Sequence, residues 1–430
     1  MPTAKKRILW LHTQPESYHN LMLDDLARGT GYQVPGMADE HSDEFDWIAG
    51  FAHRGPGLYA QNALPAAAQT LFLRVLPGKE ARGPTMHERY HVDWRADLRA
   101  LGDSPLGPDA VIVSGYGQRS FREIIAACHA TGVPVAMWSD SNLRNNRGRG
   151  LAARLKRCLK RRVLRKLVSS VDCLMTANSR GVAYWRYFGG PEARAKIVLS
   201  PCYANYRQVD AAKAMDRAAV LGQFGLSAQD RVLFSSARLL RLKGLDLVIR
   251  AFGASGLDQR GWKYVIAGSG PMEAELKTVA GPSLGKTVHL IGFQQPTDNL
   301  ALMAHADVMV LASRFEAHGI VIGEALAAGT PVLVSDIPGA AFDLVRPGVN
   351  GLRFRSDDQA DLIHKLQLLA DDTLRAALRL HARPAFESWY RRTSPMLAAP
   401  RVVRRLLAVR STAFRLSSAT PQNTPPGGGE

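Results

Sequence analysis

The chain has 430 residues, of which 46% are hydrophobic and 22% charged, and this balance argues against a disordered chain. The length exceeds that of one compact core and suggests about two domains. The 55 Lys and Arg residues outnumber the 38 Asp and Glu residues, giving a formal net charge of +17. This excess indicates an anionic partner, which could be nucleic acid, acidic lipid or a phosphorylated substrate.

No uncharged apolar run approaches the roughly 20 residues that a membrane-spanning helix needs, so any membrane contact is expected to be peripheral. The basic, then apolar, stretch Met1–His12 is too short for a signal-peptide core and predicts a first buried strand. The four cysteines are widely spaced without a Cys-x-x-Cys pair. We expect them to be reduced and buried in a cytoplasmic protein, without a structural zinc site.

Short apolar runs alternate with helical patterns along the chain. In the first half, strands are predicted at Ala110–Ser114, Val133–Trp138 and Val171–Ala177, and helices at Phe121–Ala130, Leu151–Val168 and Arg180–Phe188. In the second half, strands are predicted at Val232–Ala237, Tyr264–Ala267, Val288–Ile291, Val308–Ala312 and Val332–Ser335. Strand–helix alternation predicts an α/β fold with two doubly wound parallel sheets. Few periodic elements are visible between Ala38 and His91.

The boundary between the two domains is expected between Ser200 and Leu226, which gives an N-terminal domain of residues 1–205 and a second of residues 206–385. Ligands of such sheets bind beyond the carboxyl ends of the strands, so the cleft between the domains is the expected site. The segment Pro384–Val409 is predicted to be helical. Residues 417–430 are rich in Ser, Thr, Pro and Gly and are predicted to be a disordered tail.

Two carboxylates flank a predicted helix start in the second half. Glu316 ends a strand-to-helix loop, and Glu324 follows about two helical turns later, so both can face one cleft. Between them, His318, Gly319 and Ile320 form a helix N-terminus, whose free N–H groups favour a phosphate. Carboxylates accept hydrogen bonds from sugar hydroxyls. Taken alone, the pair is more typical of a capped helix with one exposed acid and one buried ion pair.

Cations and glycines follow other strands of the same domain. Arg238 and Lys243 lie between a strand and a helix, where they can stabilise the charge of a leaving nucleoside diphosphate. Gly268-Ser269-Gly270-Pro271 and Ile291-Gly292-Phe293 follow two further strands. Glycines at strand ends let a backbone approach a ligand.

The order of these elements resembles the retaining glycosyltransferases of family 4, which have the GT-B architecture of two facing Rossmann-like domains. The resemblance is close from Val232 to Phe354. It implies a C-terminal helix, residues 386–416, that packs back on the N-terminal domain. It also implies that Arg238 and Lys243 hold the donor diphosphate, that Glu324 binds the ribose, and that Glu316 binds the donor sugar. The remaining donor contacts would come from main-chain groups of His318, Gly319 and Ile320 and from Gly270, Gly292 and Phe293.

The resemblance implies a nucleotide-sugar donor, UDP- or GDP-linked, and no cofactor. The acceptor, a glycan or glycolipid, would bind the N-terminal domain, where Tyr18 and Asp140 are the candidate contacts. That half departs from the family pattern: a glycine pair is missing after the first strand, and Asp140 lies where many members have a histidine. Retention implies that the acceptor attacks from the face that the diphosphate leaves, and the phosphate can take the acceptor's proton.

We predict no metal site. The chain lacks an Asp-x-Asp triplet, and cationic side chains with a helix dipole can replace Mg²⁺. The zinc-protease pattern His-Glu-x-x-His occurs at His87–His91, but it lacks an apolar helix to carry it, so we interpret it as a chance match.

A strongly basic stretch coincides with the predicted helix Leu151–Val168. Leu151, Leu155, Leu159, Val163 and Leu167 recur every four residues beside a cationic face with Arg154, Arg157, Lys160, Arg161 and Arg165. This pattern fits a helix lying on anionic lipid, which would place the protein on the inner face of the plasma membrane. Nucleic acid is the rival partner, which we do not favour. A helix that packs its leucines on its own domain is the structural alternative.

Three functions therefore stay open: a transferase with a lipid-linked or cell-surface polysaccharide acceptor, a transferase with a soluble acceptor, and a degenerate transferase scaffold that binds anionic lipid or nucleic acid. We favour the first.

Overall fold

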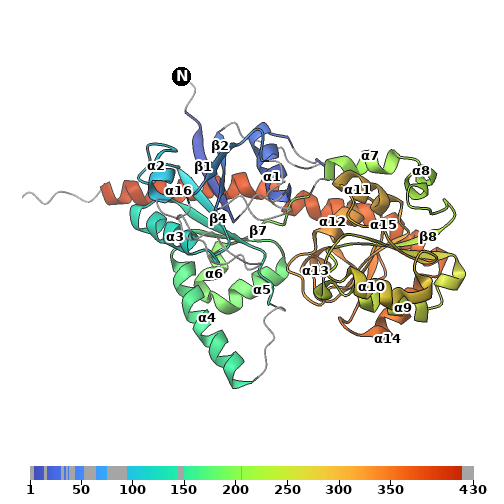
Figure 1. The fold of residues 1–430 in the computed structure, drawn as a ribbon. Helices are drawn as coiled ribbons and strands as arrows, with labels where there is room; N and C mark the ends of the chain where they lie inside the picture. Colours follow the sequence, from blue (N-terminus) through green and yellow to red (C-terminus); the bar gives the residue numbers. More distant parts are fainter. Residues whose placement is uncertain are drawn as a thin grey trace, which may run out of the picture.

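A computed structural model describes residues 4–13, 17–30, 33–34, 37, 44–52, 64–74, 94–143, 150–204 and 206–418. Two α/β domains lie side by side, each built on its own sheet (Figure 1). The pattern His87–His91 and residues 419–430 of the predicted tail lie outside the described residues.

The N-terminal sheet has seven strands in the order β3-β2-β1-β4-β5-β6-β7, all paired in parallel. The strands are β1 (Lys6–His12), β2 (Phe45–Phe51), β3 (Gln69–Phe72), β4 (Ala110–Ser114), β5 (Val135–Ser139), β6 (Cys173–Thr176) and β7 (Ile197–Leu199). The helices are α1 (Ser17–Arg28), α2 (Trp94–Arg99), α3 (Arg119–Thr131), α4 (Leu151–Ser169), α5 (Ser179–Phe188) and α6 (Pro191–Lys196).

The second sheet has six parallel strands in the order β10-β9-β8-β11-β12-β13. The strands are β8 (Arg231–Ser236), β9 (Trp262–Ala267), β10 (Val288–Leu290), β11 (Val308–Leu311), β12 (Val332–Ser335) and β13 (Gly351–Phe354). The helices are α7 (Val209–Ala214), α8 (Arg217–Gly222), α9 (Leu245–Ala254), α10 (Glu273–Ala280), α11 (Pro296–His305), α12 (Ile320–Ala327), α13 (Ala340–Leu344) and α14 (Gln359–Leu368).

Strand β1 shows why the first sheet is covered on both faces. Ile8 and Trp10 pack in one apolar cluster, whereas Leu9 and Leu11 pack in another. Because successive side chains of a strand point to opposite faces, β1 is apolar on both, as expected when helices cover both sides of a parallel sheet. The predicted α/β class with two doubly wound parallel sheets is confirmed. Strands β2, β3 and β13 were not predicted.

Two long helices end the described chain, and they belong to different domains. Helix α15 (Asp372–Thr393) packs on α12 and α13, whereas α16 (Pro395–Ser418) packs on α1 and on strands β4, β5 and β7. The predicted return of the C-terminal helix to the first domain is confirmed (Figure 1). The predicted start of that helix at residue 386 falls inside α15, because the chain turns only at Ser394, where Pro395 lacks the N–H that would continue α15. Helix α16 extends to Ser418, two residues into the predicted tail.

Candidate functional site

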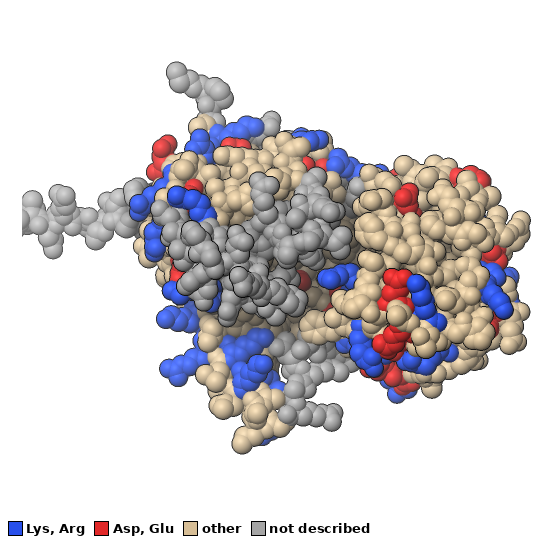
Figure 2. All heavy atoms as spheres, in the orientation of Figure 1, with Lys and Arg blue, Asp and Glu red and all other residues tan. Residues whose placement is uncertain are grey.

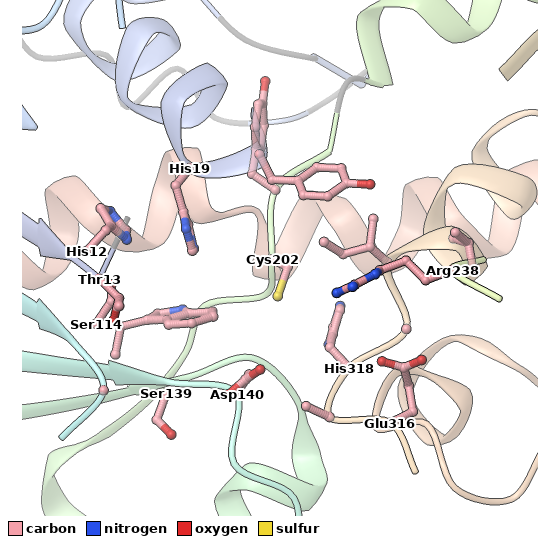
Figure 3. A pocket seen from close by; sticks show the side chains of 18 of the residues that line it. His12, Thr13, His19, Ser114, Ser139, Asp140, Cys202, Arg238, Glu316 and His318 are labelled. Atoms are coloured by element: carbon pink, nitrogen blue, oxygen red, sulfur yellow. The ribbon is translucent and has the colours of Figure 1, made fainter. Parts of the chain in front are cut away.

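A cavity of about 570 Å³ lies between the two domains, at the carboxyl ends of both sheets (Figure 3). The N-terminal domain contributes the ends of β1, β4 and β5 and the start of α1, and the second domain contributes the ends of β8 and β11 and the start of α12. The lining residues are His12, Thr13, Tyr18, His19, Ser114, Gly115, Trp138, Ser139, Asp140, Cys202, Tyr203, Ser236, Arg238, Lys243, Leu311, Glu316, Ala317, His318, Gly319, Ile320 and Val321.

The predicted site residues divide into two groups. Eight of them line the cavity: Arg238, Lys243, Glu316, His318, Gly319, Ile320, Tyr18 and Asp140. Four do not line it: Glu324, Gly270, Gly292 and Phe293. The first group spans both domains, so donor and acceptor candidates face one enclosed space.

The cations of the second domain differ in their partners. Lys243 Nζ lies 2.5 Å from Glu316 Oε2, and both side chains are largely buried. The Ser313 hydroxyl donates to the same Glu316 oxygen at 3.2 Å. Arg238 is exposed at the cavity wall and has no hydrogen bond or ion pair within the described part of the chain (Figure 3). An unpaired guanidinium beside a neutralised lysine leaves positive charge for an anionic ligand.

The loop that carries Lys243 is tied to the loop that carries Glu316. The Arg314 backbone N–H donates to the Leu242 carbonyl at 2.7 Å, and the Arg314 guanidinium donates to the Arg241 carbonyl at 2.7 Å. Gly244 follows in a left-handed conformation with φ of 67°, and a Cβ there would lie 2.2 Å from the Ala312 carbonyl oxygen. Only glycine fits this close approach, which fixes the position of Lys243.

The segment at the start of α12 combines a buried histidine with a glycine turn. Burial lowers the pKa of His318 to about 4, so the imidazole is neutral at pH 7. Gly319 has φ of 91° and precedes the first residue of α12. The free N–H groups of this helix start therefore face the cavity beside a neutral side chain.

Glu324 lies in the second turn of α12, is half-buried, and is not among the residues that line the cavity. Burial raises the pKa of its carboxyl to about 7. Glu316 and Glu324 were both expected to face one cleft, but only Glu316 lines the cavity.

The two glycines predicted to approach the donor, Gly270 and Gly292, have different surroundings. Gly270 packs on the strand end that carries Arg238, since a Cβ at Gly270 would lie 2.6 Å from the Leu239 carbonyl oxygen. Gly292 has φ of 74° and open space around it, and the neighbouring Phe293 is 58% exposed. Gly270 thus supports Arg238, whereas Gly292 and Phe293 present a free surface.

The N-terminal wall of the cavity contains aromatic side chains that the sequence did not single out. His12 and His19 stack with ring centroids 4.0 Å apart, and His19 meets Trp138 edge-on at 5.5 Å. Burial lowers the pKa of His12 well below its usual range. Their only sequence signal was their place just after β1 and at the end of β5. His12 and His19 lie across the cavity from Arg238 (Figure 3), and Trp138 and Tyr18 also line the cavity.

Helix α4 projects from the N-terminal domain (Figure 1). Leu151, Leu155, Leu159 and Val163 are 83%, 63%, 58% and 58% exposed, whereas Leu164, Leu167 and Val168 are buried. The apolar stripe therefore faces solvent over most of its length, rather than the helix's own domain. Figure 2 shows Lys and Arg side chains gathered on this helix.

The predicted membrane-facing cations of α4 lie in different places. Arg154 and Arg165 are exposed. Lys160 lies over the rings of Tyr184 and Phe188, and Arg161 over the ring of Tyr187, so both pack on α5. Arg157 is half-buried on the same side of the helix. The cations beside the exposed leucines are instead Lys156, Arg162 and Lys166, which are all exposed.

Three further findings concern metals, membranes and thiols. No group of three or more His, Cys, Asp or Glu residues that could hold a metal ion occurs within the described ranges. None of the helices in those ranges is both long and apolar enough to cross a bilayer. The four cysteines form no disulfide, but the expectation that all are buried is wrong. Cys158 is exposed, because the face of α4 that carries it does not pack on the domain. Cys202 is half-buried at the cavity.

Comparison with known proteins places this site in a family. Residues 216–384 match the family model "Glycosyl transferases group 1". The α-D-kanosaminyltransferase of Streptomyces kanamyceticus is 31% identical over 41% of this chain and 45% of its own length. The D-inositol 3-phosphate glycosyltransferase of Nocardia farcinica is 31% identical over 40% of this chain and 41% of its own length. The chain thus spans less than half the length of these curated relatives.

Solved structures agree in fold over nearly the whole chain. The Anabaena protein HepE, solved with UDP and glucose, superposes with a TM-score of 0.60 and 17% identity, covering 96% of this chain and 100% of that protein. WaaG, a glycosyltransferase involved in lipopolysaccharide biosynthesis, gives a TM-score of 0.62 and 17% identity, covering 94% and 99%. Residues 216–384 therefore belong to the glycosyl transferases group 1, in a chain that has the GT-B fold.

Proposed function

We propose that this protein is a retaining, metal-independent glycosyltransferase that moves a sugar from a nucleoside diphosphate donor to a lipid-linked or cell-surface polysaccharide acceptor. The observation that carries the proposal is the unpaired Arg238 beside the Lys243–Glu316 pair, in a cavity closed by the second domain. Arg238 and Lys243 would bind the diphosphate, and Glu316 a hydroxyl of the donor sugar. The fold supports this assignment, since HepE shares it and holds UDP and glucose.

The reaction breaks the bond between the anomeric carbon and the phosphate oxygen and forms one to an acceptor oxygen. The departing diphosphate gains negative charge, which Arg238 and Lys243 would stabilise from loops whose backbone is held in place. The acceptor proton would pass to the departing phosphate oxygen on the same face, so the configuration is retained. No side-chain base is required.

The acceptor would enter from the N-terminal wall, where Tyr18, Asp140, His19 and Trp138 line the cavity. Aromatic rings offer apolar faces to sugar rings, and the Asp140 carboxylate can accept a hydroxyl hydrogen bond.

We further propose that α4 docks the enzyme on the inner face of the plasma membrane. Exposed Leu155 and Leu159 would enter the headgroup boundary, and Arg162 and Lys166 would meet anionic lipid. Such docking would bring a lipid-linked acceptor to the cavity. WaaG, which shares the fold, acts in lipopolysaccharide biosynthesis.

A soluble acceptor is the alternative, supported by the similarity to the D-inositol 3-phosphate glycosyltransferase of Nocardia farcinica. A degenerate scaffold that only binds polyanions is less well supported, because binding polyanions gains nothing from Glu316 beside Lys243.

Turnover tests the proposal. The purified chain, in EDTA, is incubated with a panel of UDP- and GDP-sugars, with and without bacterial inner-membrane lipid, and nucleotide release is followed. We expect one donor to be consumed, faster with lipid, and not by an Arg238→Ala/Lys243→Ala variant. Consumption stimulated equally by water-soluble acceptors without lipid would favour the alternative. No consumption of any donor would contradict the proposed function.

A further inference from the structure

Two asparagine side chains of the N-terminal domain are buried against the second domain. Asn142 follows β5 and is 3% exposed, and Asn178 follows β6 and is fully buried. Both lie where the carboxyl ends of the N-terminal strands face the donor side of the cavity. A buried amide is costly unless it is hydrogen-bonded, so their partners are informative.

Those partners are backbone carbonyls of the cavity wall on the other domain. Asn142 Nδ2 donates to the carbonyls of Glu316, Ala317 and Ile337 at 3.2, 3.4 and 3.1 Å. Asn178 Nδ2 donates to the Ala317 carbonyl at 3.2 Å and lies 3.4 Å from His318 Nδ1. The main chain of Glu316 and Ala317 and the ring of His318 are therefore contacted by amides that belong to the opposite domain.

This segment bears the groups that would act in the proposed donor site. The Glu316 carboxylate pairs with Lys243, and the segment leads into the first turn of α12 at Gly319. When Asn178 donates to Nδ1 of neutral His318, the hydrogen of the imidazole sits on Nε2. The two amides thus set the position of the Glu316 backbone and the orientation of the His318 ring.

The second domain is shaped to receive Asn178. Gly339, at the start of α13, has no side chain, and a Cβ there would lie 2.3 Å from Asn178 Nδ2. Its φ of −60° is one that any residue adopts, so the glycine is required for space and not for conformation. Helices α5 and α13 also meet through Arg180, which stacks on the Phe342 ring, and through the Ser179 N–H, which donates to Asp343 at 2.9 Å (Figure 1).

We propose that Asn142 and Asn178 are positioning residues, which hold the Glu316–His318 segment in its transfer geometry only when the two domains are closed. The inference rests on the proposed function for its activity readout. Because these bonds join the two domains, closure of the acceptor domain also assembles the donor-sugar site. A nucleoside diphosphate without a sugar needs only the second domain, so its binding does not depend on them.

Three variants of the full chain break the contact in different ways. Asn142→Ala removes the amide that reaches Glu316. Asn178→Ser removes the second amide but keeps an oxygen that can cap α5, where the Asn178 side chain now accepts from the Gly181 N–H. Gly339→Ala removes no hydrogen-bonding group and instead crowds Asn178 from the other domain. Arg180→Ala is the matched control, because it loses a contact of the same interface without touching Glu316–His318.

Each protein is measured for nucleoside diphosphate affinity by calorimetry, for hydrolysis of the bound nucleotide sugar, and for domain separation by small-angle scattering. We expect kcat to fall about tenfold or more in all three variants, as when an interaction made only in the transition state is lost. Nucleotide affinity should stay within about twofold, and the scattering should show a more open molecule, whereas Arg180→Ala should keep its kcat.

The result that would overturn the proposal is unchanged kcat in Asn142→Ala and Asn178→Ser, or an equal loss of kcat in Arg180→Ala. If the wild-type chain binds no nucleotide, the proposed function is contradicted instead. The scattering comparison would then still test whether Asn142 and Asn178 hold the two domains together.

Discussion

The Lys243 ammonium and the Glu316 carboxylate lie 2.5 Å apart in the wall of the interdomain cavity. Without a ligand, each neutralises the other. In the proposed donor site, a diphosphate that binds Lys243 would compete with Glu316 for the ammonium, and this would free the carboxylate for a sugar hydroxyl. The pair would therefore link binding of the diphosphate to binding of the sugar.

Separate substitutions of the two residues should have different effects. Lys243→Ala should weaken nucleoside diphosphate binding. Glu316→Gln should leave that binding equal or tighter, because the competing carboxylate is gone, but should lower kcat by about 100-fold, as for loss of one electrostatic contact to a transition state. Calorimetry and turnover distinguish the two. Lys277→Ala, which breaks the exposed pair with Glu273, is the control. Equal loss of nucleotide affinity in Lys243→Ala and Glu316→Gln would refute this coupling.

The buried carboxyl of Glu324 predicts an unusual dependence of stability on pH. Burial raises its pKa to about 7, above its value of about 4.3 in an unfolded chain. Its contribution to stability is therefore complete below that lower pH and is lost as the pH rises through about 7. Glu324→Gln should have a higher urea midpoint than the wild type at pH 8, and the difference should shrink steadily as the pH falls towards 4. A constant difference across this range would show that Glu324 does not titrate there.

The raised pKa of Glu324 also predicts how nucleotide affinity depends on pH. If the Glu324 carboxylate accepts the ribose hydroxyls, nucleotide affinity should increase between pH 6 and pH 8 as the group ionises. In Glu324→Gln the affinity should be lower, with only the pH dependence of the nucleotide's own phosphate remaining. Calorimetry at each pH provides both curves. Parallel curves for the two proteins would remove Glu324 from the donor site.

Gly244 predicts a stability effect with a local consequence. Gly244→Ala forces a side chain into the left-handed region, at about 1–2 kcal/mol, and places a Cβ 2.2 Å from the Ala312 carbonyl oxygen. We expect a lower free energy of unfolding and weaker nucleotide binding, because Lys243 is the adjoining residue. Gly253→Ala, at an exposed and uncrowded position of helix α9, is the control, and should gain up to about 1 kcal/mol. Chemical denaturation measures both, and a Gly244→Ala protein as stable as the wild type would contradict the argument.

The exposed stripe of α4 predicts binding to anionic vesicles. Leu155→Ser/Leu159→Ser should reduce flotation with phosphatidylglycerol vesicles, since two apolar side chains no longer enter the interface. Leu380→Ser, which alters a leucine that is 70% exposed on α15, is the matched control and should float as the wild type does. Vesicles of phosphatidylcholine alone should bind weakly. Undiminished flotation of the double variant would exclude this face of α4 as the docking surface.

The sequence predicted best those elements whose signals are local. Continuous apolar runs located the buried strands β4, β8, β9, β11 and β12 to within about two residues, the usual uncertainty at element ends. Strands β2 and β13 were missed because a charged residue interrupts each apolar run, Asp46 in β2 and Arg353 in β13.

Contacts between distant residues could not be predicted in this way. The periodicity of α4 located the helix but not its buried side, which is decided by Tyr184, Tyr187 and Phe188 on α5. Asn142 and Ile337 are 195 residues apart in the chain, and nothing around Asn142 indicates that its amide reaches another domain. The motif from Arg238 to Glu324 located the donor half of the cavity, whereas His12 and His19 became visible only when β1 and α1 were placed beside it.

The most direct test of the donor site is calorimetric titration of the full chain with UDP, GDP and ADP in EDTA, beside Arg238→Ala/Lys243→Ala. The account predicts that one nucleotide binds without metal and that the double variant loses at least about 100-fold in affinity, since each cation supplies a charge-assisted contact. Absence of binding by all three nucleotides, or equal binding by the variant, would contradict the assignment of Arg238 and Lys243 to the donor diphosphate.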